Sequence, residues 1–94
     1  MFIVRETFTA KPGHASALAK KFKQVFADLP QIKTRVLTDF VAAFNTVVLE
    51  TEVADLNEFG KQMQEYQSRE DIQAKMKGYA DMYTEGRREI YRIM

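Results

Sequence analysis

Six side chains of this sequence are candidates for moving protons or holding anions. They are His14, Asp39, Tyr66, Tyr79, Tyr83 and Arg88. An imidazole or a carboxylate can accept a proton, a phenol can orient a polar substituent, and a guanidinium can hold an anion. The chain has no cysteine, which removes thiolate nucleophiles, thiolate metal ligands and disulfide bonds. Acid–base chemistry and anion binding are therefore the chemistry to look for.

His14 is the only histidine, and histidine is the residue type that titrates near neutral pH. It follows Lys11-Pro12-Gly13 and is expected at the start of a helix, where the helix dipole favours a neutral imidazole. It is either a general base or orienting donor at the mouth of a pocket, or an exposed turn residue. A single histidine does not make a metal site, so we expect neither a metal nor a cofactor.

Tyr66, Tyr79 and Tyr83 lie in a region where apolar residues recur at helical spacing. The side chains that could line an aromatic pocket with them are Phe22, Phe26, Phe59, Met63, Met76 and Met82. In such a pocket a tyrosine hydroxyl could orient a phenolic substrate. The alternative is ordinary core packing with the hydroxyls at its edge.

Asp39 is expected on the second strand and Arg88 on the fourth. Asp39 could act as a base, while Arg88, like Arg35 and Arg92, could hold an anion. The alternative use of these charges is in salt bridges within the sheet or at a subunit interface. The chain has no glycine-rich phosphate loop, nucleophile elbow or paired-carboxylate motif.

The elements that position these side chains follow from hydrophobic periodicity. Spacings of three and four predict a helix over residues 15–26, which Pro30 prevents from continuing. A second helical region is predicted to begin after Asp55, restart at residues 68–71 and end at Gly86. Alternation of apolar and polar residues predicts strands over 2–9, 33–41, 46–53 and 88–94.

The predicted element order is β-α-β-β-α-β in one domain spanning residues 1–94. Right-handed crossovers place both helical regions on one face of a four-stranded antiparallel sheet, which is a ferredoxin-like α+β fold. Apolar residues fall on both sides of each strand, for example Phe2 and Ile3, or Val47 and Val48. Leaving several of them in water forgoes roughly 1.5–3 kcal/mol each. We therefore predict a homodimer packed sheet against sheet; a monomer with a solvated face is the alternative.

Composition excludes several classes of function. The chain has 14 basic and 13 acidic residues, a net charge of +1, so no strong field attracts nucleic acid or an acidic membrane. No apolar run approaches the roughly 20 residues that span a bilayer. Met1 is followed at once by a strand-like segment, so we expect no signal peptide. The absence of cysteine favours a cytoplasmic location.

Three segments together resemble the dimeric α+β barrel superfamily, and within it the NIPSNAP-like and antibiotic-biosynthesis-monooxygenase-like proteins. They are Lys11-Pro12-Gly13-His14, the hairpin from Thr38-Asp39-Phe40 to Asn45-Thr46-Val47-Val48-Leu49-Glu50, and Gly86-Arg87-Arg88-Glu89-Ile90-Tyr91-Arg92. The resemblance covers nearly the whole chain. It implies a homodimer whose two sheets form a barrel, with a pocket in each subunit between sheet and helices.

The resemblance also limits the chemistry. Some relatives oxidise quinol-like or polycyclic aromatic compounds without metal or flavin, and others isomerise small lactones or cleave haem. Haem-degrading relatives use an Asn on the first strand and a Trp and a His in the second helical region. This chain has no Trp and no His within residues 55–83, which argues against haem cleavage.

Two functions remain open. The first is a cofactor-independent monooxygenase or isomerase acting on a small aromatic or polyketide-like compound. The absent Trp weakens the oxygenase version of it. The second is a non-catalytic dimeric module that binds a hydrophobic ligand or a protein partner.

Overall fold

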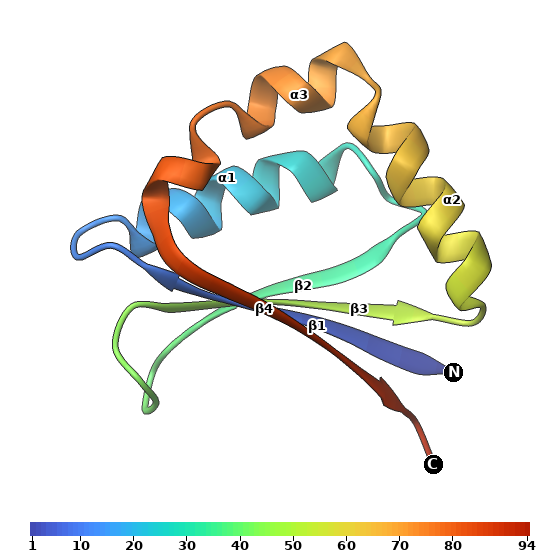
Figure 1. The fold of residues 1–94 in the computed structure, drawn as a ribbon, viewed down its shortest axis with the longest axis horizontal. Coiled ribbons are helices and arrows are strands. Elements are labelled where there is room, and N and C mark those ends of the chain that lie inside the picture. Colours follow the sequence, from blue (N-terminus) through green and yellow to red (C-terminus); the bar gives the residue numbers. More distant parts are fainter.

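The computed structural model describes all of residues 1–94 and has one antiparallel sheet with its helices on a single face (Figure 1). The strands are β1 (Phe2–Ala10), β2 (Lys33–Thr38), β3 (Thr46–Val53) and β4 (Tyr83–Arg92), in the spatial order β2-β3-β1-β4. The helices are α1 (Ala15–Ala27), α2 (Leu56–Gln67), α3 (Glu70–Met76) and the short 3-10 helix η1 (Tyr79–Met82). The predicted α+β, ferredoxin-like βαββαβ fold is confirmed.

Strand register decides which side chains meet the helices. Phe8 lies opposite Val47, and Glu6 lies opposite Leu49 on one side and Arg88 on the other. Residues directly opposite in an antiparallel pair point to the same face. The helix-facing side of β1 and β3 therefore packs on the apolar stripe of α1. The main buried cluster consists of Phe8, Ala10, Leu18, Ala19, Phe22, Val47 and Leu49.

The helices do not cover the sheet evenly. Helix α1 packs on β1, β2 and β3, whereas the edge strand β4 packs against η1. The helix-facing side of β4 is consequently open: Ile90 is 50% exposed, and the Arg88 side chain is 60% exposed. This edge is where a ligand can reach the space between sheet and helices.

The predicted end of the second strand was wrong. Strand β2 ends at Thr38 instead of residue 41, because Asp39 belongs to the loop that joins β2 to β3. The Asp39 N–H donates to the Thr46 carbonyl at 3.1 Å, and the Thr46 N–H donates to Asp39 Oδ1 at 2.9 Å. Asn45 adopts a left-handed conformation (φ 64°) in the same loop, which asparagine tolerates in turns.

The predicted end of the second helical region was also wrong. Gly86 lies within β4, which begins at Tyr83 instead of residue 88. Gly78 follows α3 in its place, with φ +85°, a conformation that favours glycine. The predicted restart is confirmed, since α2 ends at Gln67 and α3 begins at Glu70.

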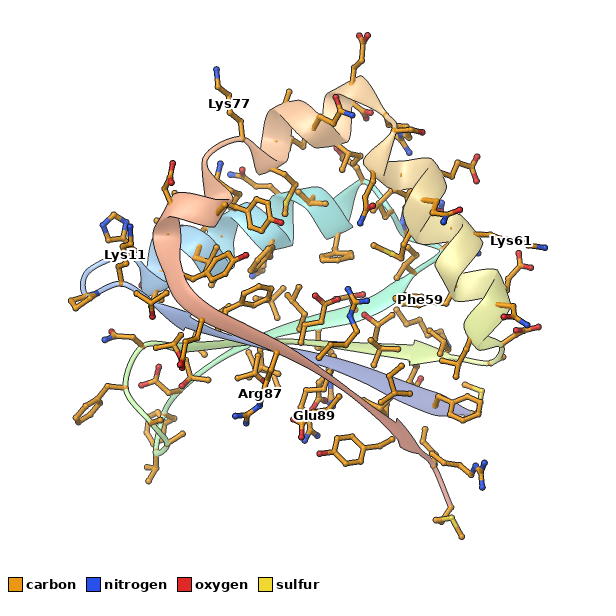
Figure 2. The ribbon with its side chains drawn as sticks, viewed as in Figure 1. Lys11, Phe59, Lys61, Lys77, Arg87 and Glu89 are labelled. Atoms are coloured by element: carbon orange, nitrogen blue, oxygen red, sulfur yellow. The ribbon has the colours of Figure 1, made fainter.

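The sheet face away from the helices carries apolar and charged residues together. Its apolar residues are Ile3, Leu37, Val48 and Tyr91. They are interspersed with the charged residues Arg5, Lys33, Arg35, Glu50, Glu52, Glu85, Arg87 and Glu89. In Figure 2, Arg87 and Glu89 project from β4 to this side, whereas Lys61 and Lys77 project outward from the helical layer. The prediction that each strand also carries apolar residues on this side is confirmed, but the charged residues outnumber them. We call this charge-rich surface the open face.

Candidate functional site

An apolar cavity of about 160 Å³ lies between the sheet and the helices. Eleven of its fourteen lining residues are hydrophobic. The hydrophobic ones come from β1, β3, α1, α2, α3, η1 and the loop after α1. The predicted lining residues Phe22, Phe26, Met63 and Met76 are confirmed as part of its wall. Two further predicted residues are not: Phe59 lines a separate hollow beside the end of β3, and Met82 packs against the main cluster.

A shallower hollow of about 380 Å³ adjoins this cavity, and we call it the vestibule. The two spaces share Glu6, Phe8, Tyr79 and Arg88. Gly86 lines the vestibule directly above the Phe8 ring, and a Cβ at this position would lie 3.3 Å from Phe8 Cδ1. The absence of a side chain at Gly86 therefore keeps the approach to the cavity open.

Four polar side chains gather where cavity and vestibule meet, and we call Glu6, Arg88, Tyr79 and Tyr83 the mouth cluster. Pairing of β1 with β4 sets Glu6 opposite Arg88, with Arg88 Nη2 3.4 Å from Glu6 Oε1. The rings of Tyr79 and Tyr83 lie 5.8 Å apart between centroids. The cluster thus combines a carboxylate, a guanidinium and two phenol groups at the rim of an apolar space.

The pKa of Tyr79 is raised by its surroundings in the mouth cluster. Burial, the neighbouring Tyr83 and the Glu6 carboxylate all raise the pKa of Tyr79 above its ordinary value of 10.0. A phenol whose pKa is raised carries its proton throughout the neutral range, so Tyr79 is a hydrogen-bond donor there. This leaves the Glu6 carboxylate as the proton acceptor of the cluster.

The structure brings together three of the six predicted site residues. Tyr79, Tyr83 and Arg88 meet in the mouth cluster, and Tyr66 lines the cavity wall. The Tyr66 hydroxyl, however, accepts a hydrogen bond from Gln31 Nε2, and Gln31 is not part of the cavity lining.

The other two predicted site residues lie apart from the cavity. His14 is exposed at the N-cap of α1, where its side chain makes no capping hydrogen bond. Asp39 closes the β2–β3 loop. Neither lines the cavity or the vestibule.

Glu6 was missed by the sequence analysis, although the sequence carried a signal for it. It falls on the same side of β1 as Phe2, Val4 and Phe8. A carboxylate on the core-facing side of a strand needs a partner or a function, because burying an unpaired charge is costly.

No group of three or more His, Cys, Asp or Glu side chains is placed to hold a metal ion. None of the helices has the length and apolar character to cross a membrane.

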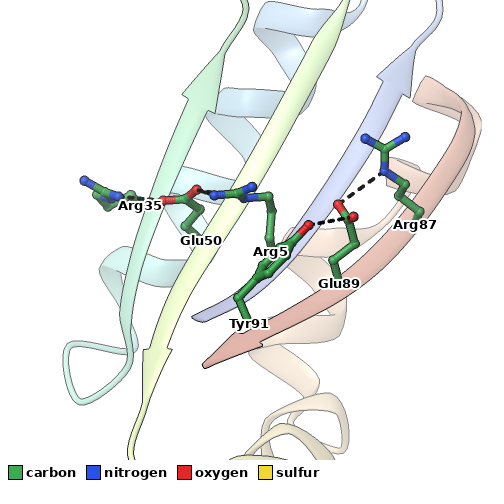
Figure 3. A network of polar contacts seen from close by, with 6 residues as sticks. All are labelled: Arg5, Arg35, Glu50, Arg87, Glu89 and Tyr91. Atoms are coloured by element: carbon green, nitrogen blue, oxygen red, sulfur yellow. Dashed lines mark hydrogen bonds and ion pairs between the residues drawn. The ribbon is translucent and has the colours of Figure 1, made fainter. Parts of the chain in front are cut away.

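A second polar network lies on the open face (Figure 3). The Glu50 side chain is 10% exposed and accepts hydrogen bonds from Arg5 Nε at 2.9 Å and Arg35 Nη2 at 2.5 Å. Arg5 also stacks on the Tyr91 ring, at 5.2 Å from the centroid. The hydrogen bond from Arg35, together with Arg5, outweighs the burial of Glu50 and lowers its pKa below the ordinary 4.5.

Glu50→Gln is expected to make the free energy of unfolding less dependent on pH in the acid range. Because the folded-state pKa of Glu50 is lowered, its ion pairs stabilise the fold above about pH 4.5 and are lost as the pH falls through that lower pKa. The variant should lose about 1 kcal/mol of unfolding free energy at pH 7, since both arginines are partly exposed and screened. Urea unfolding at pH 7 and pH 3 measures this. Glu52→Gln, an exposed neighbour on the same face, is the control; equal pH dependence in both variants contradicts the assignment.

Solved structures of other proteins share the fold of this chain. No protein-family model matches the chain, and no curated protein matches it in sequence. Among solved structures, a NIPSNAP domain protein from Burkholderia xenovorans has a TM-score of 0.86 at 14% identity, over 100% of this chain and 95% of that one. A NIPSNAP family protein from Agrobacterium tumefaciens has a TM-score of 0.85 at 9% identity, over 99% of this chain and 85% of the other.

An antibiotic biosynthesis monooxygenase has a TM-score of 0.73 at 11% identity, over 100% of this chain and 99% of that one. The predicted resemblance to NIPSNAP-like and antibiotic-biosynthesis-monooxygenase-like proteins is therefore confirmed for the fold. Identities this low show the fold alone, and a fold hosts many functions.

Proposed function

We propose that the protein binds a small aromatic compound in the cavity and acts on it without a cofactor, as a monooxygenase or an isomerase. The observation that carries this proposal is the mouth cluster, which sets a carboxylate and several hydrogen-bond donors at the rim of an apolar cavity. A cavity of this kind orients an apolar ring and directs its polar substituent toward the chemistry.

Both reactions begin with the removal of a proton that leaves an enolate or phenolate. Glu6 accepts the proton, and Arg88 and the protonated Tyr79 donate hydrogen bonds to the developing oxyanion. In the isomerase, the proton returns to a different carbon. In the monooxygenase, a ring CH₂ of an anthrone-like compound becomes C=O, or a phenol with a free para C–H becomes a para-quinone; either reaction consumes one O₂ and releases one water. The reaction is an isomerisation if the deprotonated substrate is protonated again at another carbon, and an oxygenation if it reacts with O₂.

The activity is tested with small quinols and anthrone-like compounds under oxygen, and with unsaturated lactones in deuterated water. Oxygen uptake identifies the monooxygenase, and deuterium incorporation at the carbon next to the carbonyl identifies the isomerase. Tyr79→Phe is expected to lower kcat by about 10- to 100-fold, because it removes one donor to the oxyanion. Tyr66→Phe is the matched control, since the Tyr66 hydroxyl is bound by Gln31.

A non-catalytic module is the second candidate, and one observation favours it. The charge of Glu6 is already offset by Arg88, so the mouth cluster could serve affinity alone. Thermal stabilisation by aromatic compounds without oxygen uptake or deuterium exchange would support this module and contradict the enzyme.

We also propose that the protein is a homodimer, located in the cytoplasm. The support for the dimer is the β2–β3 loop, in which Phe40, Val41 and Phe44 are 100%, 90% and 86% exposed. The Asp39–Thr46 hydrogen bonds fix the base of this loop. The loop projects beyond the sheet on the side away from the helices (Figure 1), so these three side chains extend the open face.

The open face is also suited to a second copy by its charges. Acidic and basic side chains alternate across it, as in the network formed by Arg35, Glu50 and Arg5. Two copies related by a two-fold axis can therefore pair opposite charges. A stable dimer buries about 800 Å² per partner. Phe40 and Phe44 alone offer roughly 300–500 Å² of that area, and the apolar residues of the open face add to it.

A further inference from the structure

We propose that the ligand is a monocyclic aromatic acid, with one six-membered ring in the cavity and its carboxylate on Arg88. This inference rests on the proposed function and narrows its substrate class. It follows from three properties of the cavity: its volume, the side chains that form its wall, and the balance of donors and acceptors at its mouth.

The volume of the cavity matches a ligand with one ring. The cavity measures about 160 Å³, and an apolar protein cavity of about 150 Å³ holds one benzene molecule. A fused second ring would have to extend past the mouth cluster into the vestibule. Buried residues such as Phe22 and Leu49, which are 2% and 6% exposed, form part of the wall. A close-packed wall of this kind yields only at a cost in stability.

The wall selects an aromatic ring. Phe8 and Phe22 pack with ring centroids 5.1 Å apart, and Phe22 meets Tyr79 edge-on at 6.2 Å. A planar ligand can continue this set of aromatic contacts. Met63 and Met76 complete the wall, and their thioether groups adapt to a ring edge.

The hydrogen-bond donors of the mouth cluster favour an anionic group on the ligand. Arg88 has one ionic contact, to Glu6 at 3.4 Å, whereas a guanidinium carries five N–H donors. Tyr79 is a further donor at the same rim. The single contact with Glu6 leaves most of these donors free for a ligand, and a neutral ligand would leave most of them to water. A carboxylate matches the planar guanidinium with two parallel hydrogen bonds.

Titration calorimetry tests the inference with benzoate, benzamide, phenol and 2-naphthoate. Benzamide keeps the ring and the shape of benzoate but lacks its charge, while 2-naphthoate keeps the charge and adds a ring. Benzoate is expected to bind at least about tenfold more tightly than benzamide, as expected for a hydrogen bond to a charged group. It should also bind more tightly than 2-naphthoate. Equal affinity for benzoate and benzamide, or tighter binding of 2-naphthoate, overturns the inference.

Arg88→Gln is expected to abolish the preference for benzoate over benzamide. Arg92→Gln is the matched control, because Arg92 lies on the same side of β4 as Arg88 but lines neither the cavity nor the vestibule. Arg88 is largely exposed, so the variant should unfold at the same temperature as the wild type. A benzoate preference that survives in Arg88→Gln contradicts the role of Arg88. Tight phenol binding with weak benzoate binding identifies a phenolate ligand and contradicts the carboxylate.

These binding measurements separate the inference from the proposed function. Selective benzoate binding without turnover of any substrate supports the ligand class and contradicts the enzyme. Turnover of a polycyclic substrate without benzoate binding supports the enzyme and contradicts the ligand class. Absence of binding by all four compounds contradicts the inference.

Discussion

Glu6→Gln is expected to lower kcat by about 100- to 10,000-fold, the range for loss of a general base. The Glu6 carboxylate lies at the rim of the cavity and is the proton acceptor of the mouth cluster, because burial and its neighbours keep Tyr79 protonated. Glutamine preserves the size of the side chain but cannot take up a proton. Steady-state kinetics on whichever substrate shows turnover measures the effect.

Ligand affinity distinguishes loss of the base from loss of the site. Removing the Glu6 charge frees Arg88 from its only ionic contact, so an aromatic acid should bind to Glu6→Gln at least as tightly as to the wild type. Glu6→Asp keeps a carboxylate but shortens the side chain by one methylene group, so this variant should retain part of the activity. A kcat within about threefold of the wild-type value for Glu6→Gln excludes Glu6 as the base.

The double substitution Phe40→Ser and Phe44→Ser is expected to raise the dissociation constant of the dimer by at least about 100-fold. Aromatic side chains are enriched among the interface residues that contribute about 2 kcal/mol or more each, and a two-fold axis applies each substitution twice. Both rings are almost fully exposed in the single chain, so the change should not destabilise the fold of the subunit. Sedimentation velocity over a range of concentrations measures the dissociation.

The double substitution Lys61→Ser and Lys77→Ser provides the control, because these lysines project outward from the helical layer (Figure 2). It should leave the dimer unchanged. A wild-type protein that sediments as a single copy at high concentration refutes the dimer. So does a Phe40→Ser and Phe44→Ser variant that dissociates no more readily than the wild type.

The local pattern of apolar and polar residues was sufficient to predict the helices and strands whose conformation depends on their own residues. Strand β3 runs over the predicted residues 46–53, because its alternation of apolar and polar side chains suits one buried and one exposed side. Helix α1 likewise follows its apolar stripe. The order of these elements then left few possible topologies, and the predicted fold was correct.

The ends of some helices and strands depend on contacts with residues far along the chain. The local pattern of apolar and polar residues could not predict these ends. Strand β2 ends at Thr38 because the next residue, Asp39, binds Thr46 across the loop. Gly78 and Gly86 are the same residue type, but only Gly78 takes the left-handed conformation that ends a helix. Which glycine does so depends on where β4 must begin to pair with β1.

The sequence by itself determined the fold and the side of the strand on which Glu6 lies. Only the tertiary structure decided that Glu6 faces Arg88 beside Tyr79, and that His14 and Asp39 stand apart from them. It also decided that the open face is rich in charge. The physical reason is that periodicity fixes the direction of a side chain relative to its own element. Contacts between elements depend on strand register and helix packing, which the whole chain sets together.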